Sequence, residues 1–459
     1  MSSIAIKAAE LVVKIKARLA AFRGLREFMD DYPFDEISMK ALRGREGAYP
    51  FGEVGTYGAA VLGASVSRRS YPRFLSLDDL VLYPPAFTPR RLEKMAELLR
   101  EPVFTDVNLE TELGGFKSAA PFVVASMGST DIASRYSIQI AKAAAAEGVP
   151  MGIGENVATV RGYGARRSKL HPSFKERVMA YLGNLDGRGG VFIQQNVEDS
   201  YDEHWNKVYS DKDLEPFIEE GRVGFEVKVG QGAKPGLGGV IRMRKEDAIK
   251  VRDKYHFLED PLTAKGKYVE RYSVPGTFTP DILRGTIRMM RNNYPRAKIW
   301  IKTGPYRDVA EIIRIASEEG ADAVVIDGKE GGTGMAPSTA MKELGYPTVV
   351  GLKKIMDARL GGAGLGLLVA GRLFNGAHVV KSIALGASGI YVGRPLILAA
   401  MIRGEKGVRN YIEAVKVETQ MLVSALGKYD VREVSREDVA SLNQDLARMF
   451  GIPYVYSRE

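Results

Sequence analysis

The chain has 459 residues, of which 45% are apolar and 26% charged, an ordinary composition for a soluble globular protein. Its formal net charge is +9, but the basic residues are scattered in pairs such as Arg90–Arg91, and no nucleic-acid-binding motif is present. The absence of cysteine excludes disulfides, cysteine-ligated iron–sulfur clusters and cysteine nucleophiles. The four histidines lack metal-ligand spacing, so no metal site is predicted.

The first 104 residues are predicted to form an N-terminal, mostly helical extension. Residues 4–23 have the period of an amphipathic helix, which we expect to pack on the rest of the protein or on another subunit, so a homo-oligomer is compatible with it. Charges interrupt this helix, which excludes a secretory signal, and runs such as Gly364–Ala370 are too short to cross a bilayer. We therefore expect a cytoplasmic protein. Residues 24–104 look irregular apart from a helical stretch near Pro89–Arg100.

The pattern becomes regular from about residue 105, where apolar extended segments alternate with helical ones such as Ile132–Glu147, Asp308–Gly320 and Gly376–Gly386. The extended segments are Pro121–Ser126, Val149–Gly154, Gly190–Gln195, Gly224–Gly230, Lys298–Gly304, Ala321–Gly328, Gly366–Gly371 and Gly389–Gly393. Eight such units predict an α/β fold, a (β/α)₈ TIM barrel over residues 105–425, followed by a short helical C-terminal tail over 426–459. A doubly wound sheet is the alternative, but its early G-x-G-x-x-G turn is missing.

The fourth extended segment leads into a glycine-rich loop, EVKVGQGAKPGLGG, over residues 226–239. Alternation places Glu226 and Lys228 on one face of the strand, where buried charges are costly unless they are paired or used. The loop offers Gln231 and Lys234 among glycines, which suits an anionic substrate. The alternative is a surface loop with a solvated lysine.

The last two strands end in Gly371-Arg372 and Gly393-Arg394, where barrels of this kind commonly bind a phosphate group. Glycine turns with salt-bridged arginines are the alternative. Lys302, at the end of the fifth strand, could stabilise negative charge on a reduced flavin, or it could simply pair with a carboxylate such as Asp327.

These motifs carry a resemblance to a known family. The QGAKPGxGG loop, the Ile301-Lys302 pair and the segment from Asp327 through GGTG resemble the FMN-binding synthase domain of glutamate synthase, in its stand-alone archaeal-type form, over residues 105–425. The resemblance implies an FMN-dependent oxidoreductase that converts 2-oxoglutarate and ammonia, through 2-iminoglutarate, to L-glutamate. It therefore implies FMN as the cofactor.

The resemblance also implies roles for individual residues. Lys228, Glu155 and Lys302 would be catalytic, with Glu155 positioning ammonia or relaying its proton. Gln231, Lys234 and Arg271 would bind 2-oxoglutarate. The cofactor would contact Ala125, Ser126, Met127, Gln195, Lys228, Lys302, Asp327, Gly331, Gly332, Thr333, Gly371, Arg372, Gly393 and Arg394.

The sequence departs from the family in ways that imply partners. The iron–sulfur cysteines expected after the eighth strand are missing, and Ser2 stands where the amidotransferase cysteine is expected. Ammonia and electrons would then come from separate glutaminase and electron-donor subunits. Asn156, Lys329 and Val240 also differ from the residues common at these positions, which bears on the identity of the substrate.

Other functions remain open at this point. Within the same chemistry, the chain could be a subunit of an N-methylglutamate synthase complex, in which methylamine replaces ammonia. An FMN-dependent isomerase of the isopentenyl diphosphate type would use the same barrel but leaves the QGAKPGxGG loop unexplained. A flavin-binding scaffold subunit is the non-enzymatic alternative. IMP dehydrogenase is excluded because it needs a cysteine, and a hydroxy-acid oxidase is disfavoured because His378 lies in a predicted helix.

Overall fold

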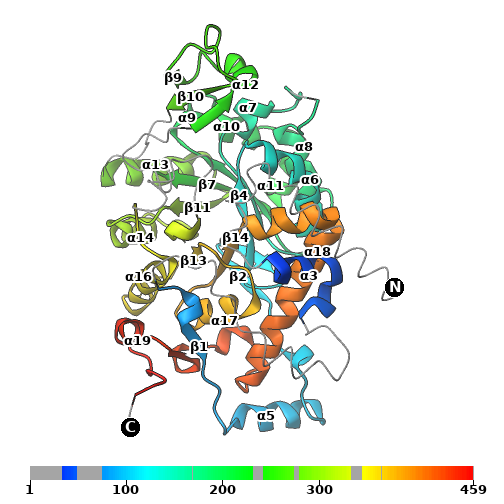
Figure 1. Cartoon of the computed structure of the whole chain (residues 1–459), viewed down its shortest axis with the longest axis vertical. Coiled ribbons are helices and arrows are strands. Elements are labelled where there is room, and N and C mark those ends of the chain that lie inside the picture. Colours follow the sequence, from blue (N-terminus) through cyan, green and yellow to red (C-terminus); the bar gives the residue numbers. More distant parts are fainter. Residues whose placement is uncertain are drawn as a thin grey trace.

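The protein is organised around a closed barrel of eight parallel strands (Figure 1). The computed structural model describes residues 34–48, 75–167, 169–230, 241–272, 279–331, 344–362 and 364–457. In chain order, the barrel strands are β4 (Phe122–Met127), β5 (Met151–Ile153), β6 (Val191–Gln195), β7 (Val223–Val229), β11 (Lys298–Thr303), β12 (Ala323–Asp327), β13 (Gly366–Ala370) and β14 (Gly389–Val392). Each predicted extended segment overlaps one of them, so the (β/α)₈ prediction is confirmed.

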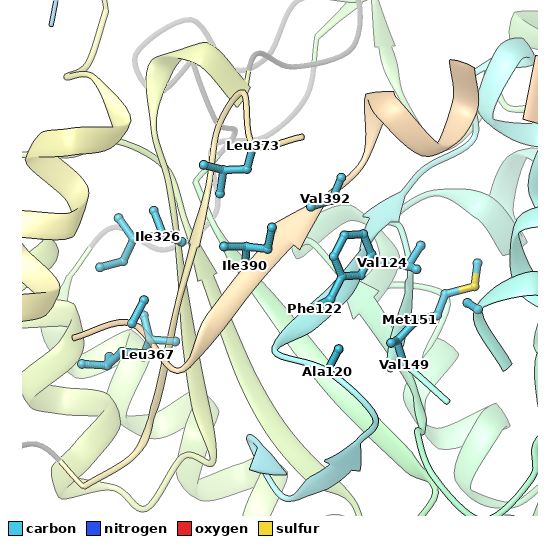
Figure 2. Packing of buried hydrophobic residues seen from close by; sticks show 14 of the residues in the cluster. Ala120, Phe122, Val124, Val149, Met151, Ile326, Leu367, Leu373, Ile390 and Val392 are labelled. Carbon is cyan, nitrogen blue, oxygen red and sulfur yellow. The ribbon is translucent and has the colours of Figure 1, made fainter. Parts of the chain in front are cut away.

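Both faces of the barrel sheet are apolar, as expected for parallel strands that are covered on two sides. Figure 2 shows Phe122, Ile390 and Val392 in the outer layer, where they join the large apolar cluster that includes residues of the surrounding helices. On the inner face, Phe192 and Trp300 stack with ring centroids 4.4 Å apart. The strands therefore read as nearly continuous apolar runs, and polar residues gather where they end.

A short hairpin closes the amino end of the barrel. Its strands, β2 (Thr111–Leu113) and β3 (Phe116–Ser118), are joined at Gly114 and Gly115. The Trp300 indole N–H donates a hydrogen bond of 2.9 Å to the Gly114 carbonyl, and the Phe116 ring lies 6.0 Å from the Trp300 ring. Because this end is filled, the carboxyl end of the strands is left for ligands.

Helices surround the barrel. The longer ones are α6 (Asp131–Ala146), α8 (Phe174–Leu182), α13 (Pro280–Asn293), α14 (Val309–Glu318), α16 (Thr348–Leu360), α17 (Gly376–Ala384) and α18 (Arg394–Ala425). Shorter ones lie in the connections: α7 (Val157–Arg161), α9 (Val197–Ser200), α10 (His204–Tyr209) and α11 (Glu215–Glu219). Non-helical dihedral angles at Arg403 and Gly404 kink α18. The three predicted barrel helices are confirmed within a few residues. No helix in the described part of the chain is long and apolar enough to cross a membrane.

The N-terminal region packs on the barrel in two places. Helix α3 (Phe34–Arg43), followed by the turn η2 (Gly44–Ala48), lies against α18 (Figure 1), and its buried Lys40 pairs with Glu36 and Glu418. The expectation of irregular structure was wrong for this helix, because a short helix is stabilised mainly by tertiary packing, which local sequence does not reveal. The predicted helix near residues 89–100 is confirmed as α5 (Pro89–Leu98), and the predicted helix at 4–23 lies outside the described residues.

A segment that precedes the barrel pairs with the C-terminal tail in a small sheet. The segment η4 (Leu77–Asp79) leads into β1 (Leu80–Leu82), which pairs antiparallel with β15 (Val439–Ser441). The tail also contains η8 (Val431–Glu433), η9 (Arg436–Asp438) and helix α19 (Gln444–Phe450), while η5 (Phe104–Asp106) precedes the barrel. A helical C-terminal tail was expected, but strand β15 was not. The boundaries at residues 104 and 425 stay predictions.

An unpredicted excursion follows β7 and projects from the carboxyl end of the barrel, at the top of Figure 1. It consists of β8 (Ile241–Arg244), α12 (Lys245–Lys250), β9 (His256–Phe257) and β10 (Tyr268–Tyr272), in a sheet of order β8-β10-β9. Two ion pairs join it to the β5 and β6 connections, Arg161–Asp247 at 3.5 Å and Lys254–Asp202. The excursion therefore sits beside the mouth of the barrel.

Candidate active site

Four charged side chains meet where β5, β7, β11 and β12 end. Lys228 on β7 and Lys302 on β11 are neighbours in the sheet register and both face inward. Lys228 Nζ lies 2.5 Å from Oε1 of Glu155, just beyond β5, and Lys302 Nζ lies 3.4 Å from Oδ2 of Asp327 on β12. The predicted catalytic residues Lys228, Glu155 and Lys302 are thus brought together at one mouth.

Mutual pairing shifts the pKa values of Glu155 and Lys302 in favour of their charged forms. Burial alone would raise the pKa of Glu155, but the adjacent Lys228 ammonium outweighs this effect and lowers it. Burial likewise acts to lower the pKa of Lys302, but the carboxylates of Asp327, Glu226 and Glu155 raise it above its ordinary value. The mouth therefore favours the ionised forms of the Glu155 carboxyl group and the Lys302 amine.

Directly below lies a buried carboxyl group, Glu226 on β7, which is 0% exposed. It accepts hydrogen bonds from Ser126 Oγ at 2.9 Å, from the Tyr391 hydroxyl at 3.2 Å and from the Gln194 side-chain amide. The Tyr391 hydroxyl in turn accepts a hydrogen bond of 2.8 Å from the Ser126 backbone N–H. Four strands of the barrel, β4, β6, β7 and β14, thus meet on one polar cluster inside an otherwise apolar core.

The residues predicted to line a flat cofactor lie on the same side of the mouth. Ala125, Ser126 and Met127 end β4, and Gln195 ends β6. The Gln195 Oε1 atom is buried and has no hydrogen-bond partner within the described ranges. A buried amide oxygen without a partner is costly, so a ligand that donates to it would satisfy the site. These residues fit a flavin ring.

The predicted phosphate end is built around two glycines. Gly371 has a φ of 123°, and a Cβ there would lie 2.1 Å from Thr348 Oγ1, so only glycine fits this turn. Gly393 caps the N-terminus of α18, where backbone N–H groups suit an anion. Gly331 packs beside Asp327, while Gly332 and Thr333 lie outside the described residues.

The two predicted phosphate-binding arginines have different surroundings. Arg394, the first residue of α18, donates a hydrogen bond to the Glu330 carbonyl oxygen. Arg372, with a φ of 52°, lies over the Phe374 ring at 5.2 Å and pairs with Asp78 of η4. Arg394 thus contacts the turn that follows β12, whereas Arg372 contacts the N-terminal segment.

Of the predicted substrate ligands, Gln231 and Lys234 lie outside the described residues, and Arg271 is on β10. Arg271 is 2% exposed, and its guanidinium lies 3.7 Å above the Tyr255 ring. The Tyr255 hydroxyl donates a 2.6 Å hydrogen bond to Asn156 Oδ1, next to Glu155 in sequence. The excursion therefore connects Arg271 to the turn that carries the candidate carboxylate.

Sequence reasoning missed three residues of this region. Gln194 contacts Glu226 from the neighbouring strand β6, where the two residues are register partners, and Tyr391 contacts it from β14 across the barrel. Only their inward-facing positions beside polar strand ends signalled this. Asp78 reaches Arg372 from a distant segment, and no local signal in the sequence indicated it. In the described part of the chain, no group of three or more acidic or histidine side chains could hold a metal ion.

Comparison with known proteins agrees with the motifs. A family model described as a conserved region in glutamate synthase matches residues 116–403. The archaeal-type glutamate synthase (NADPH) of Thermotoga maritima is 31% identical over 179 residues, which is 38% of this chain and 34% of the relative. The archaeal glutamate synthase (NADPH) of Archaeoglobus fulgidus is 34% identical over 181 residues, again 38% of this chain and 34% of the relative. The chain thus matches about a third of the length of these relatives.

The fold also occurs in solved structures. A mandelate oxidase variant with the monooxide FMN adduct has a TM-score of 0.50 at 20% identity, covering 78% of this chain and 87% of that chain. A flavocytochrome b2 variant with benzoylformate has a TM-score of 0.52 at 17% identity, covering 83% of this chain and 80% of that chain. At such low identity these likenesses establish the barrel fold alone.

Proposed function

Because the chain belongs to the glutamate synthase family, over the conserved region at residues 116–403, we propose that its barrel binds FMN and reductively aminates 2-oxoglutarate to L-glutamate. The observation that carries this proposal is the convergence of Lys228, Glu155 and Lys302 at one mouth, with the Lys228–Glu155 contact at 2.5 Å. Unrelated surface lysines would not share buried carboxylate partners in this way.

The donor set at the mouth suits a flavin mononucleotide. The unsatisfied Gln195 oxygen is an acceptor for a ring N–H, and Lys302 is a cation for negative charge on the ring. The Gly393 end of α18, together with Arg394, suits a terminal phosphate. When bound, FMN would supply a hydride to the substrate.

The chain's own residues would bind substrate and manage protons. Lys228 would polarise the keto oxygen of 2-oxoglutarate and the imine nitrogen that replaces it. The Glu155 carboxylate accepts hydrogen bonds, so it would orient ammonia and take up the proton released on attack. The Lys228 contact favours the ionised form of Glu155, which is the form that can accept that proton.

A dicarboxylic substrate also needs cations away from the reacting carbon. Lys234 and Gln231 of the glycine-rich loop are proposed to bind one carboxylate, and Arg271 the other. Arg271 is buried on Tyr255 beside the Asn156 turn, so its guanidinium is held near Glu155 rather than on the outer surface.

Ammonia and electrons are proposed to come from other polypeptides. The 459 residues contain no cysteine, so they hold neither thiolate ligands for an iron–sulfur cluster nor a cysteine nucleophile for glutamine hydrolysis. The proposed partners are therefore a glutaminase and an electron-donor subunit, in the cytoplasm.

Ligand binding tests this function directly. The purified protein is expected to be yellow, to release FMN rather than FAD on denaturation, and to change its flavin spectrum on titration with 2-oxoglutarate. Lys234→Ala should weaken that titration severalfold or more, because it removes a charge-assisted contact. The control is Lys212→Ala, at an exposed position. A colourless protein that takes up no FMN would contradict the cofactor, and equal titrations would remove Lys234 from the site.

A further inference from the structure

The buried carboxyl group of Glu226 has no role in the proposed chemistry, yet it lies directly under the mouth. We propose that Glu226 is a positioning residue that exchanges a proton with the mouth through Ser126 and so sets the charge beneath the cofactor. This inference deepens the proposed function and rests on it.

The first support is that every hydrogen-bond donor to Glu226 in the described structure is neutral. These donors are the Ser126 hydroxyl, the Gln194 amide and the Tyr391 hydroxyl. None of the ion pairs between described residues includes Glu226. A fully buried carboxylate without a paired cation is costly, so the site accommodates a neutral, protonated carboxyl group as readily as an ionised one.

The second support is a hydroxyl path to the mouth. The single hydroxyl proton of Tyr391 can be donated either to Glu226 or to Ser126 Oγ, which lies 2.6 Å away. Ser126 Oγ itself lies 2.9 Å from Glu226 Oε2. Ser126 is half-buried at the end of β4 whereas Glu226 is fully buried, so Ser126 is the more exposed end of this path. In such a transfer the Glu226 O–H bond breaks as a new O–H bond forms on Ser126 Oγ. The original hydroxyl proton of Ser126 passes to a water molecule at the mouth, and no other bond changes.

The third support is the arrangement of charges that face this cluster. Lys302 Nζ lies over the Tyr391 ring at 4.8 Å, so Tyr391 separates that cation from Glu226. The Lys302 charge still acts on the Glu226 carboxyl group through space. The other ionisable groups that face the cluster are Lys228 on β7, Glu155 after β5 and Asp327 on β12. Two lysines are balanced by Glu155 and Asp327, so ionising Glu226 makes the mouth net negative.

The electrostatics agree with this reading. Burial raises the pKa of Glu226 to about 7, despite the opposing effect of Lys302 and of the three donors. The group would therefore change charge near neutral pH.

The first test needs no cofactor. For a carboxyl group whose pKa is higher in the folded state, stability is greatest at low pH and falls as the pH rises toward the folded pKa. The difference in urea midpoint between the unloaded wild-type protein and Glu226→Gln is the quantity to measure. Relative to the variant, the wild-type protein should be less stable at about pH 9 than at about pH 5. Glu330, which is also raised to about 7, is present in both proteins and cancels. The matched control is Glu112→Gln, at an exposed position, whose difference from wild type should stay constant.

A pH-independent difference for Glu226→Gln would overturn the proposal. If that variant fails to fold, Tyr391→Phe gives the answer instead. Loss of the tyrosine hydroxyl removes a donor to the carboxylate, so the pH-dependent fall in stability should move to higher pH, and an unmoved profile would overturn the proposal.

The second test is the reduction potential of bound FMN. With Glu226 ionised, a negative charge below the site opposes reduction, so Glu226→Gln should shift the midpoint potential positively at about pH 9 and leave it unchanged at about pH 5. If Glu226 had only a structural role, Glu226→Gln would shift the midpoint potential equally at the two pH values. That outcome would overturn the link to the cofactor. A protein that binds no FMN overturns the proposed function and that link, whereas the first test still decides whether Glu226 exchanges a proton.

Discussion

At the scale of single residues, the site depends on pairing inside a low-dielectric mouth. Lys228 and Glu155 come from different strands, and their side chains are 12% and 19% exposed. A charge buried to this degree is stabilised mainly by its partner, so neither residue is expected to be replaceable alone. This coupling distinguishes the pair from the many exposed ion pairs on the outer helices.

A double-mutant cycle tests this coupling. Lys228→Met and Glu155→Gln should each lower the free energy of unfolding by about 3 kcal/mol, because each leaves or disturbs a buried charge. The double variant should lose at least about 1 kcal/mol less than the sum of the two single losses. Urea unfolding of the four unloaded proteins measures these differences, and additive losses would show that the two side chains do not interact.

The residue scale also shows what the sequence could and could not predict. Lys228, Lys302 and Glu155 were predictable because carboxyl ends of parallel strands converge, so polar strand ends meet whatever their separation in sequence. Glu226 was recognised as an unusual inward-facing charge, but its partners were not, because contacts between strands leave no local pattern. Gln194 lies on the neighbouring strand β6, and Tyr391 lies across the barrel on β14. Gln231 and Lys234 stay predictions.

At the scale of elements, the N-terminal segment η4 makes polar contacts with the end of the barrel. Asp78 pairs with Arg372 and accepts a 3.1 Å hydrogen bond from His378 Nε2, while Lys381 Nζ donates to the Leu77 carbonyl at 2.9 Å. The neutral form of His378 suits this arrangement, since its Nδ1 accepts from the Phe374 N–H. The segment was expected to be irregular, yet it holds a residue of the proposed phosphate end.

Replacement of Asp78 should weaken these contacts between η4 and the barrel. Burial would raise the pKa of Asp78, but His378 and Arg372 outweigh it and hold the pKa well below its ordinary value of 3.8. The stability it contributes is therefore present above about pH 4 and is lost as the pH falls further. At neutral pH, Asp78→Asn should lower the free energy of unfolding by about 3 kcal/mol, because Arg372 loses its buried partner.

Thermal unfolding across pH checks this expectation, with the exposed Asp253→Asn as the control. The deficit of Asp78→Asn should shrink on acidification below about pH 4, where Asp78 of the unfolded chain takes up a proton while Asp78 of the folded protein stays ionised. A deficit that is small at neutral pH, or equal at every pH, would mean that Asp78 does not stabilise Arg372 as an ion.

At the scale of the whole molecule, one barrel brings together parts that the sequence presents far apart. The eight strands could be predicted, because buried parallel strands read as repeated apolar runs. The β1–β15 pairing could not, because it depends on a contact between distant segments, and the short strands of the excursion at residues 241–272 were not predicted either. The proposed limits of the barrel domain, 105 and 425, lie close to the start of η5 and coincide with the end of α18.

The central claim is that this mouth joins an amine to 2-oxoglutarate at the expense of a reduced flavin. The most direct measurement mixes anaerobic, chemically reduced holoprotein with 2-oxoglutarate and isotopically labelled ammonium. The flavin should be reoxidised, and labelled glutamate should form in matching amount. A flavin that stays reduced with ammonium would contradict it, and reoxidation with methylamine alone would reassign the amine.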